Sequence, residues 1–294
     1  MFRTLLSTGS LISIGLGLSS VVAVTYAQRS GVVLAAAPAA NDGAQTSNVY
    51  YTTAASTGTV ELWAIQQTGR NITTTDIGPI NAGACASLAM SPTGTLFSMC
   101  GNLFGIQQLA TIDTKTGHGT LFGAPVPGLA IMAMTFAPDG VLYAVGDCNP
   151  NGAYLDCGPG SPADPNYNSL YTVDVSTGAV TRVGSTGAAE YFMDLAFDRY
   201  GNLWGVTSSL QPSYVPAVLY RIDTETGEAA KVVNLVGSSA VMGLAFAPDG
   251  KLYATDFTAN SGLYLIDPKT GFESAVAAMP FGLSSGLELA DGLL

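Results

Sequence analysis

Apolar and polar residues alternate along most of the chain in short runs, and one pattern of such runs returns several times. Its clearest copy, residues 244–279, reads Leu-Ala-Phe-Ala-Pro-Asp-Gly, then Lys-Leu-Tyr-Ala-Thr, then Leu-Tyr-Leu-Ile-Asp-Pro-Lys-Thr-Gly and a final β-rich stretch. Related copies occupy residues 88–122, 134–183 and 195–233. A two-residue period between turn signals is typical of β-strands, and a repeat of about 40–50 residues is typical of propeller blades.

Each copy predicts four antiparallel strands, with a Pro-Asp-Gly turn between the first two and an Asp-x-x-Thr-Gly turn between the last two. Residues 48–77 lack a first strand, and residues 286–292 are a first strand with nothing after it. Joined, they complete a fifth blade and remove the free edges of an open ring. We expect an all-β fold, a five-bladed β-propeller of four-stranded antiparallel blades. The C-terminal strand closes the ring as the innermost strand of the N-terminal blade.

The two turn motifs recur in register over residues 48–292 and resemble those of secreted bacterial-type β-propellers of the NHL, YVTN and SMP-30/gluconolactonase group. The Trp-Asp and Gly-His signatures of WD40 blades are absent from the sequence. The resemblance implies the fold. It does not imply an activity, because these motifs are the structural part of the repeat.

The first 27 residues have the layout of a secretory signal peptide. A basic start precedes an apolar stretch over residues 5–24, and Thr25-Tyr26-Ala27 supplies a cleavage site, with a second site near Ala39. The alternative is an uncleaved anchor, since about 20 residues can span a bilayer. Five serines in the stretch favour cleavage. We expect a signal peptide over 1–27, a flexible Ala-rich linker over 28–47 and a single β-propeller domain over 48–294, secreted or periplasmic, with no membrane span retained.

Charge narrows the choice of partners. The chain has 10 Lys and Arg against 21 Asp and Glu, a net charge of −11, so it lacks the clustered cations that nucleic acid requires. Its single histidine, His118, excludes mechanisms that need two. As partners we expect a protein or a carbohydrate at one propeller face, bound by a monomer.

Four cysteines in an exported chain are expected to pair. Cys85 and Cys100 lie symmetrically about the turn at residues 91–94, so they face each other across a hairpin. Cys148 and Cys157 bracket a short loop that a second disulfide would close. Asn71 begins an Asn-Ile-Thr sequon, which matters only if the source glycosylates secreted proteins.

Acidic residues interrupt the repeat where other copies carry small or apolar residues. Alignment of the copies predicts that five acids are candidates for the channel or its mouth: Asp147, Glu190, Asp194, Asp256 and Glu288. Converging carboxylates can hold Ca²⁺, and a pair with unequal pKa values can hydrolyse a glycosidic bond. The alternative is that these acids are solvated or cap turns in an acidic chain. Met132, Met193 and Met242 also recur at one inner-strand position, which repeat geometry explains without a cofactor.

The resemblance to known propellers also implies which acids would bind a metal ion or catalyse hydrolysis. Gluconolactonase-type propellers use Glu, Asn and Asp as channel metal ligands, and Asp194, Asp256 and Glu288 are the nearest matches here, although no matching Asn motif occurs. Five-bladed glycoside hydrolases use three inner-strand acids, which Glu190, Asp194 and Glu288 could imitate, although the surrounding motifs are absent.

The third blade carries an insertion over residues 147–168. Asp147, Asn149 and Asn151 match the first half of a Ca²⁺-binding loop, but its twelfth position holds Gly158 in place of Glu. Tyr154, Tyr167 and Tyr191 are candidates to stack on sugar rings at this face. Asx residues with Gly and Pro also form ordinary turns.

No catalytic set is complete, so the sequence favours an exported binding or interaction module over an enzyme. Its expected ligand-binding residues are Asp147, Tyr154, Tyr167, Tyr191 and Asp256. The alternative is a metal-dependent hydrolase of lactonase or glycosidase type, with Glu190, Asp194 and Glu288 as its catalytic candidates.

Overall fold

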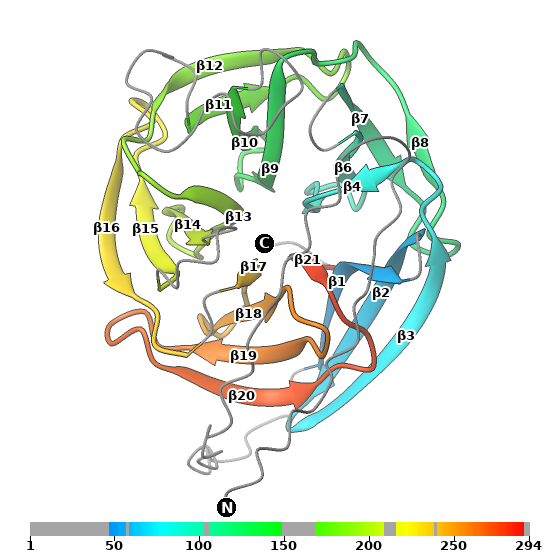
Figure 1. Cartoon of the computed structure of the whole chain (residues 1–294), viewed down its shortest axis with the longest axis vertical. Coiled ribbons are helices and arrows are strands. Elements are labelled where there is room, and N and C mark those ends of the chain that lie inside the picture. The colour runs from blue at the N-terminus through cyan, green and yellow to red at the C-terminus, as the bar shows by residue number, and fades with distance from the viewer. Residues whose placement is uncertain are drawn as a thin grey trace, which may run out of the picture.

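The computed structural model describes residues 47–56, 59–102, 106–148, 168–208, 216–237 and 240–290. These residues form five antiparallel sheets that stand like blades around a central channel (Figure 1). The expected signal peptide and linker lie outside the described residues, except Ser47, where the first strand begins. No helix in this part of the chain has the length and hydropathy of a membrane-crossing segment.

The five-bladed propeller is confirmed, and each blade has its first strand innermost. From the channel outwards, the first blade contains β21 (Ser284–Leu289), β1 (Ser47–Ser56), β2 (Thr59–Thr68) and β3 (Asn71–Pro79). In the second blade β4 (Ala84–Cys85) and β5 (Ala89–Met90) share the innermost place, followed by β6 (Leu96–Gly101), β7 (Gln107–Ile112) and β8 (Gly119–Leu121). The third blade contains β9 (Leu129–Phe136), β10 (Leu142–Cys148), β11 (Ser169–Val173) and β12 (Val180–Ser185).

The remaining two blades repeat the same order. The fourth contains β13 (Tyr191–Phe197), β14 (Leu203–Ser208), β15 (Val218–Ile222) and β16 (Ala229–Asn234). The fifth contains β17 (Val241–Phe246), β18 (Leu252–Asp256), β19 (Gly262–Ile266) and β20 (Glu273–Ala278). Inner strands run from one face to the other, so each blade has a loop face, where its second strand ends and its third begins, and an opposite turn face.

Both turn motifs form as the sequence predicts. In the Pro-Asp-Gly turn of the third blade, the Gly140 N–H donates to the Ala137 carbonyl at 2.9 Å. In the Asp-x-x-Thr-Gly turn, the Gly178 N–H donates to the Asp174 carbonyl at 2.7 Å, and the Asp174 carboxylate accepts the Ser176 N–H at 2.8 Å. The aspartates of this motif therefore hold turns at the surface.

The predicted disulfide between Cys85 and Cys100 is present. The two residues are direct partners in the β4–β6 ladder, and their Cα atoms lie 4.2 Å apart. The inner strand of this blade is interrupted between Cys85 and Ala89, where the ladder shifts by one residue. The expected Cys148–Cys157 pair cannot be followed, because Cys157 lies outside the described residues.

Each inner strand contains a β-bulge or a comparable irregularity. In the third, fourth and fifth blades the extra, unpaired residue is Met132, Met193 and Met242 respectively. A bulge re-aims a side chain relative to the regular alternation of the strand. The three methionines form one cluster with Ala86 and Tyr191. Side chains from four blades can meet only near the propeller axis, so this cluster fills the channel.

The ring closes through β21, which the sequence predicts as the innermost strand of the first blade. Its irregular ladder with β1 is reinforced by two buried hydroxyl groups. The Thr52 hydroxyl donates to the Gly286 carbonyl at 2.6 Å, and the Thr53 hydroxyl donates to the Ser285 carbonyl at 2.6 Å. These bonds satisfy carbonyl groups that the irregular ladder leaves available.

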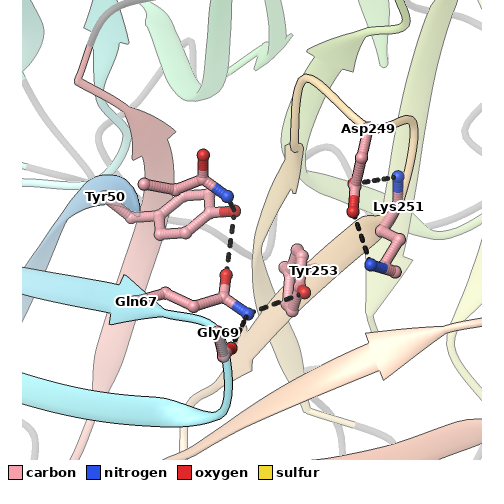
Figure 2. A network of polar contacts seen from close by, with 7 residues as sticks. Tyr50, Gln67, Gly69, Asp249, Lys251 and Tyr253 are labelled. Atoms are coloured by element: carbon pink, nitrogen blue, oxygen red, sulfur yellow. Dashed lines mark hydrogen bonds and ion pairs between the residues drawn. The ribbon is translucent and has the colours of Figure 1, made fainter. Parts of the chain in front are cut away.

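A buried polar network crosses the seam between the first and fifth blades (Figure 2). The Tyr50 hydroxyl donates to the side chain of Gln67 at 3.5 Å, and the amide of Gln67 donates to the Tyr253 hydroxyl at 2.9 Å. Burial raises the pKa of Tyr50, and Tyr253 adds to this effect, so its hydroxyl stays protonated at neutral pH. An Asp249–Lys251 ion pair lies beside the network.

Neighbouring blades also touch at their rims. The end of an outer strand meets the Thr-Gly turn of the next blade, as where the Val236 N–H donates to the Gly271 carbonyl at 2.8 Å. A Cβ on Gly271, whose φ is +73°, would lie 2.0 Å from the Asn234 carbonyl oxygen. A Cβ on Gly117 or Gly227 would lie 2.4 Å or 2.7 Å from a carbonyl oxygen of the preceding blade. Glycine in this motif therefore serves the packing of blades as well as the turn.

Candidate functional site

The turn-face end of the channel is narrow and mostly apolar. A cavity of about 40 Å³ opens there, enough for a few water molecules and too small for a sugar ring. Five equivalent residues, each the last of its inner strand, surround it: Met90, Phe136, Phe197, Phe246 and Leu289. Glu288 is the one acidic residue in this lining.

Asp194 lies on β13 and is 1% exposed. One carboxylate oxygen accepts the N–H of Leu195 at 3.0 Å. The other accepts two N–H groups from different blades, that of Leu244 at 2.8 Å and that of Leu287 at 3.0 Å. Burial raises the pKa of Asp194 well above its ordinary value, and these three hydrogen bonds oppose that effect. This carboxylate fastens the inner strands of three blades to one another.

Glu288 is the second acid inside the channel. Burial raises the pKa of Glu288, the charge of Asp194 raises it further, and a hydrogen bond from the Met90 backbone opposes both effects. Two nearby carboxyl groups that repel each other resist being ionised together. Among the predicted acids, the structure brings Asp194 and Glu288 within electrostatic reach of each other.

Two other predicted acids interact with residues of their own blades. Glu190 precedes β13. Burial raises the pKa of Tyr220 on β15, the third strand of the same blade, and the charge of Glu190 raises it further. Asp256 ends β18 and accepts the Gly262 N–H at 2.7 Å and the Tyr264 hydroxyl at 3.3 Å. Burial raises the pKa of Asp256, and these hydrogen bonds oppose that effect. Its carboxylate closes the loop between β18 and β19.

Asp147 and Tyr191 lie together at the loop face, on the third and fourth blades. Asp147 is 6% exposed near the end of β10. Burial raises the pKa of Tyr191 to about 12, and the charge of Asp147 contributes to the shift. Tyr191 also packs in the methionine cluster of the channel. The other candidates of this face, Asn149, Asn151, Tyr154 and Tyr167, lie outside the described residues.

The channel acids do not match a Ca²⁺ site. The described residues contain no group of three or more His, Cys, Asp or Glu side chains able to hold a metal ion. Three N–H donors point at the carboxylate of Asp194, and donors of this kind oppose a cation at the same oxygens. The Ca²⁺-loop pattern that starts at Asp147 continues into residues outside the described part of the chain.

Comparison with known proteins finds remote structural similarity without a matching family. No family model matches the sequence, and neither does any curated protein. A gluconolactonase from Xanthomonas campestris is 16% identical over 80% of both chains, with a TM-score of 0.48. TolB from Acinetobacter baumannii is 16% identical over 79% of this chain and 53% of its own, with a TM-score of 0.46. A chain of the nidogen/laminin complex is 10% identical over 83% of this chain and 98% of its own, with a TM-score of 0.47. These likenesses concern the fold alone and carry no argument about activity.

Alignment of the repeats finds the position of Asp194 and Glu288 but not the surroundings of either. Two of the three donors to Asp194 are backbone groups of other blades, which leave no signal in the sequence. The three methionines do leave one, because Met132, Met193 and Met242 precede the same small or acidic position in three consecutive copies. That recurrence is sufficient to predict a shared place in the ring.

Proposed function

We propose that the chain is a binding module that takes a protein or carbohydrate ligand on its loop face. The observation that carries this proposal is the state of Asp194, the most deeply placed channel acid. Its carboxylate oxygens accept three backbone N–H groups, so it joins blades together and has little capacity left for a substrate. The cavity beside Glu288, at about 40 Å³, is too small for one.

One long loop on the loop face, and two residues at its base, support the proposal. Residues 149–168 connect β10 to β11, whose adjoining ends lie at this face, and this is the longest connection between two strands of one blade. Binding residues are concentrated on loops that a rigid scaffold positions. Asp147 and Tyr191 lie at the base of this connection and offer a carboxylate beside an aromatic ring. A carboxylate beside a tyrosine hydroxyl suits hydrogen bonding to the hydroxyl groups of a sugar.

A glycan array probed with the purified chain tests the carbohydrate form of this proposal. We expect Asp147→Asn to weaken the binding of any captured glycan by fivefold or more, because a buried carboxylate acceptor is lost. Asp139→Asn, in the turn on the opposite face, serves as the matched control and leaves binding unchanged. Equal loss in both variants contradicts a site on the loop face, and absence of glycan binding leaves the protein ligand as the form to pursue.

A hydrolase is the second candidate, and one observation favours it. Asp194 and Glu288 are coupled carboxyl groups with raised pKa values, as in acid–base pairs of hydrolytic enzymes. A panel of lactones and glycosides, followed by NMR, tests this reading with the wild-type chain and Glu288→Gln. Turnover that is lost in a folded Glu288→Gln variant establishes a hydrolase and overturns the binding module as the main function.

A further inference from the structure

Three methionine side chains from consecutive blades meet in the channel near its loop-face end. Met132, Met193 and Met242 are 6%, 0% and 5% exposed. Each is the bulged residue of its inner strand. Their cluster contains only Ala86 and Tyr191 as further buried members, with Phe257 packed against it. Three of the eight methionines of the chain are thus gathered in a cluster of five buried residues.

The ring geometry makes this gathering specific. At the equivalent position the second blade carries Ala86 and the first carries Ser285, which are small residues. The methionine chains therefore extend towards the axis from one side, over short neighbours. Methionine is unbranched and has three rotatable side-chain bonds, so its sulfur atoms can approach one another without movement of the backbone.

A set of thioether sulfurs has a defined preference among metal ions. Thioethers are soft, neutral donors that select Cu(I), whereas Ca²⁺ and Mg²⁺ need oxygen ligands and Cu(II) favours nitrogen and oxygen. A cation in an apolar site also needs a nearby negative charge. Asp147 meets this need, because it pairs with Ala130 in the β9–β10 ladder, two residues from Met132, and its charge acts on Tyr191 of the same cluster.

We propose that Met132, Met193 and Met242 form a Cu(I) site at the loop-face end of the channel. The thioethers supply three neutral sulfur ligands, and Asp147 supplies the compensating charge. Binding involves no change of oxidation state, since the metal enters and leaves as Cu(I). The site shares Asp147 with the ligand site proposed for the loop face, whereas the three thioether ligands belong to the Cu(I) site alone.

The test is an anaerobic titration of the purified chain with Cu(I) in competition with the coloured chelator bicinchoninate. Thiols are counted beforehand, so that no cysteine thiolate competes for the metal. We expect one Cu(I) per chain, and X-ray absorption at the copper edge with a shell of sulfur neighbours. Met193→Leu keeps the side-chain volume and should weaken binding by tenfold or more.

Met99→Leu and Met134→Leu are the matched controls, because both residues are fully buried in a different cluster. They should leave Cu(I) affinity unchanged. If Met193→Leu fails to fold, Met132→Leu, at the most exposed of the three positions, gives the same test. The proposal is overturned if Cu(I) does not bind, if its ligand shell is nitrogen and oxygen only, or if the controls weaken binding as much as the cluster variants do.

Discussion

Single residues inside the channel show how neighbours decide what an acid does. Asp194 is surrounded by three N–H donors from three blades and acts as a fastener. Glu288 has one backbone donor, a small cavity and the charge of Asp194 beside it. The ionised carboxylate is therefore well stabilised by hydrogen bonds at Asp194 and poorly stabilised at Glu288.

Removing the charge of Glu288 should stabilise the protein at neutral pH. Because the pKa of Glu288 is raised above its ordinary value of 4.5, the folded chain keeps this proton over a pH interval in which the unfolded chain loses it. The free energy of unfolding therefore falls as pH rises through that interval. We expect Glu288→Gln to melt at a higher temperature than wild type at pH 7 and at the same temperature near pH 4.

Thermal melts from about pH 4 to 8 check this prediction. The exposed Glu228→Gln is the control and should follow the wild-type curve throughout. A Glu288→Gln variant that melts below wild type at every pH would show that the ionised carboxylate makes a favourable contact in the folded chain.

Among the elements, the Thr-Gly turns join blades as well as strands. Gly271 and Gly201 both have positive φ, +73° and +78°, but no atom lies within 4 Å of a Cβ placed on Gly201. A Cβ on Gly271 would lie 2.0 Å from the Asn234 carbonyl oxygen of the fourth blade. The two positions separate the cost of the backbone conformation from the cost of the contact between blades.

Gly201→Ala should lower the free energy of unfolding by about 1 kcal/mol, the cost of a left-handed conformation for a residue with a Cβ. Gly271→Ala should lower it by at least about twice as much, because the turn or the outer strand must also move. Urea unfolding of both variants, with m-values compared, measures the difference. Equal losses would mean that the rim contact adjusts without cost.

The sequence predicts strands and turns well because their signals are local. The turn at residues 91–94 is enough to pair Cys85 with Cys100, and the matched ends of the chain are enough to close the ring. The side of the sheet to which a side chain points is harder to predict, since alternate residues of a strand point to opposite sides and a bulge changes this alternation. Glu190 is an example, because the sequence makes it a candidate for the channel mouth but does not show that its charge also acts on Tyr220 of the same blade.

At the scale of the whole molecule, the stability of the closed ring depends on one short strand from the C-terminal end of the domain. The six residues of β21 complete the first blade and provide Leu287, a partner of Asp194. They also receive the hydroxyl hydrogen bonds of Thr52 and Thr53. Without β21 the inner edge of β1 and the apolar wall of the channel would be open to water.

Deleting residues 284–294 should therefore abolish cooperative unfolding, because an open ring exposes a sheet edge and core side chains together. Moving residues 284–290 ahead of residue 47, through a short turn, should restore it. The two segments already meet, since the Ala290 N–H donates to the Val49 carbonyl at 2.7 Å. Calorimetry should give the rearranged chain a melting temperature within a few degrees of wild type.

A truncated chain that melts like wild type would show that the other four blades close the ring without β21. A rearranged chain that fails to fold would show that chain order, and not only the presence of the strand, is required.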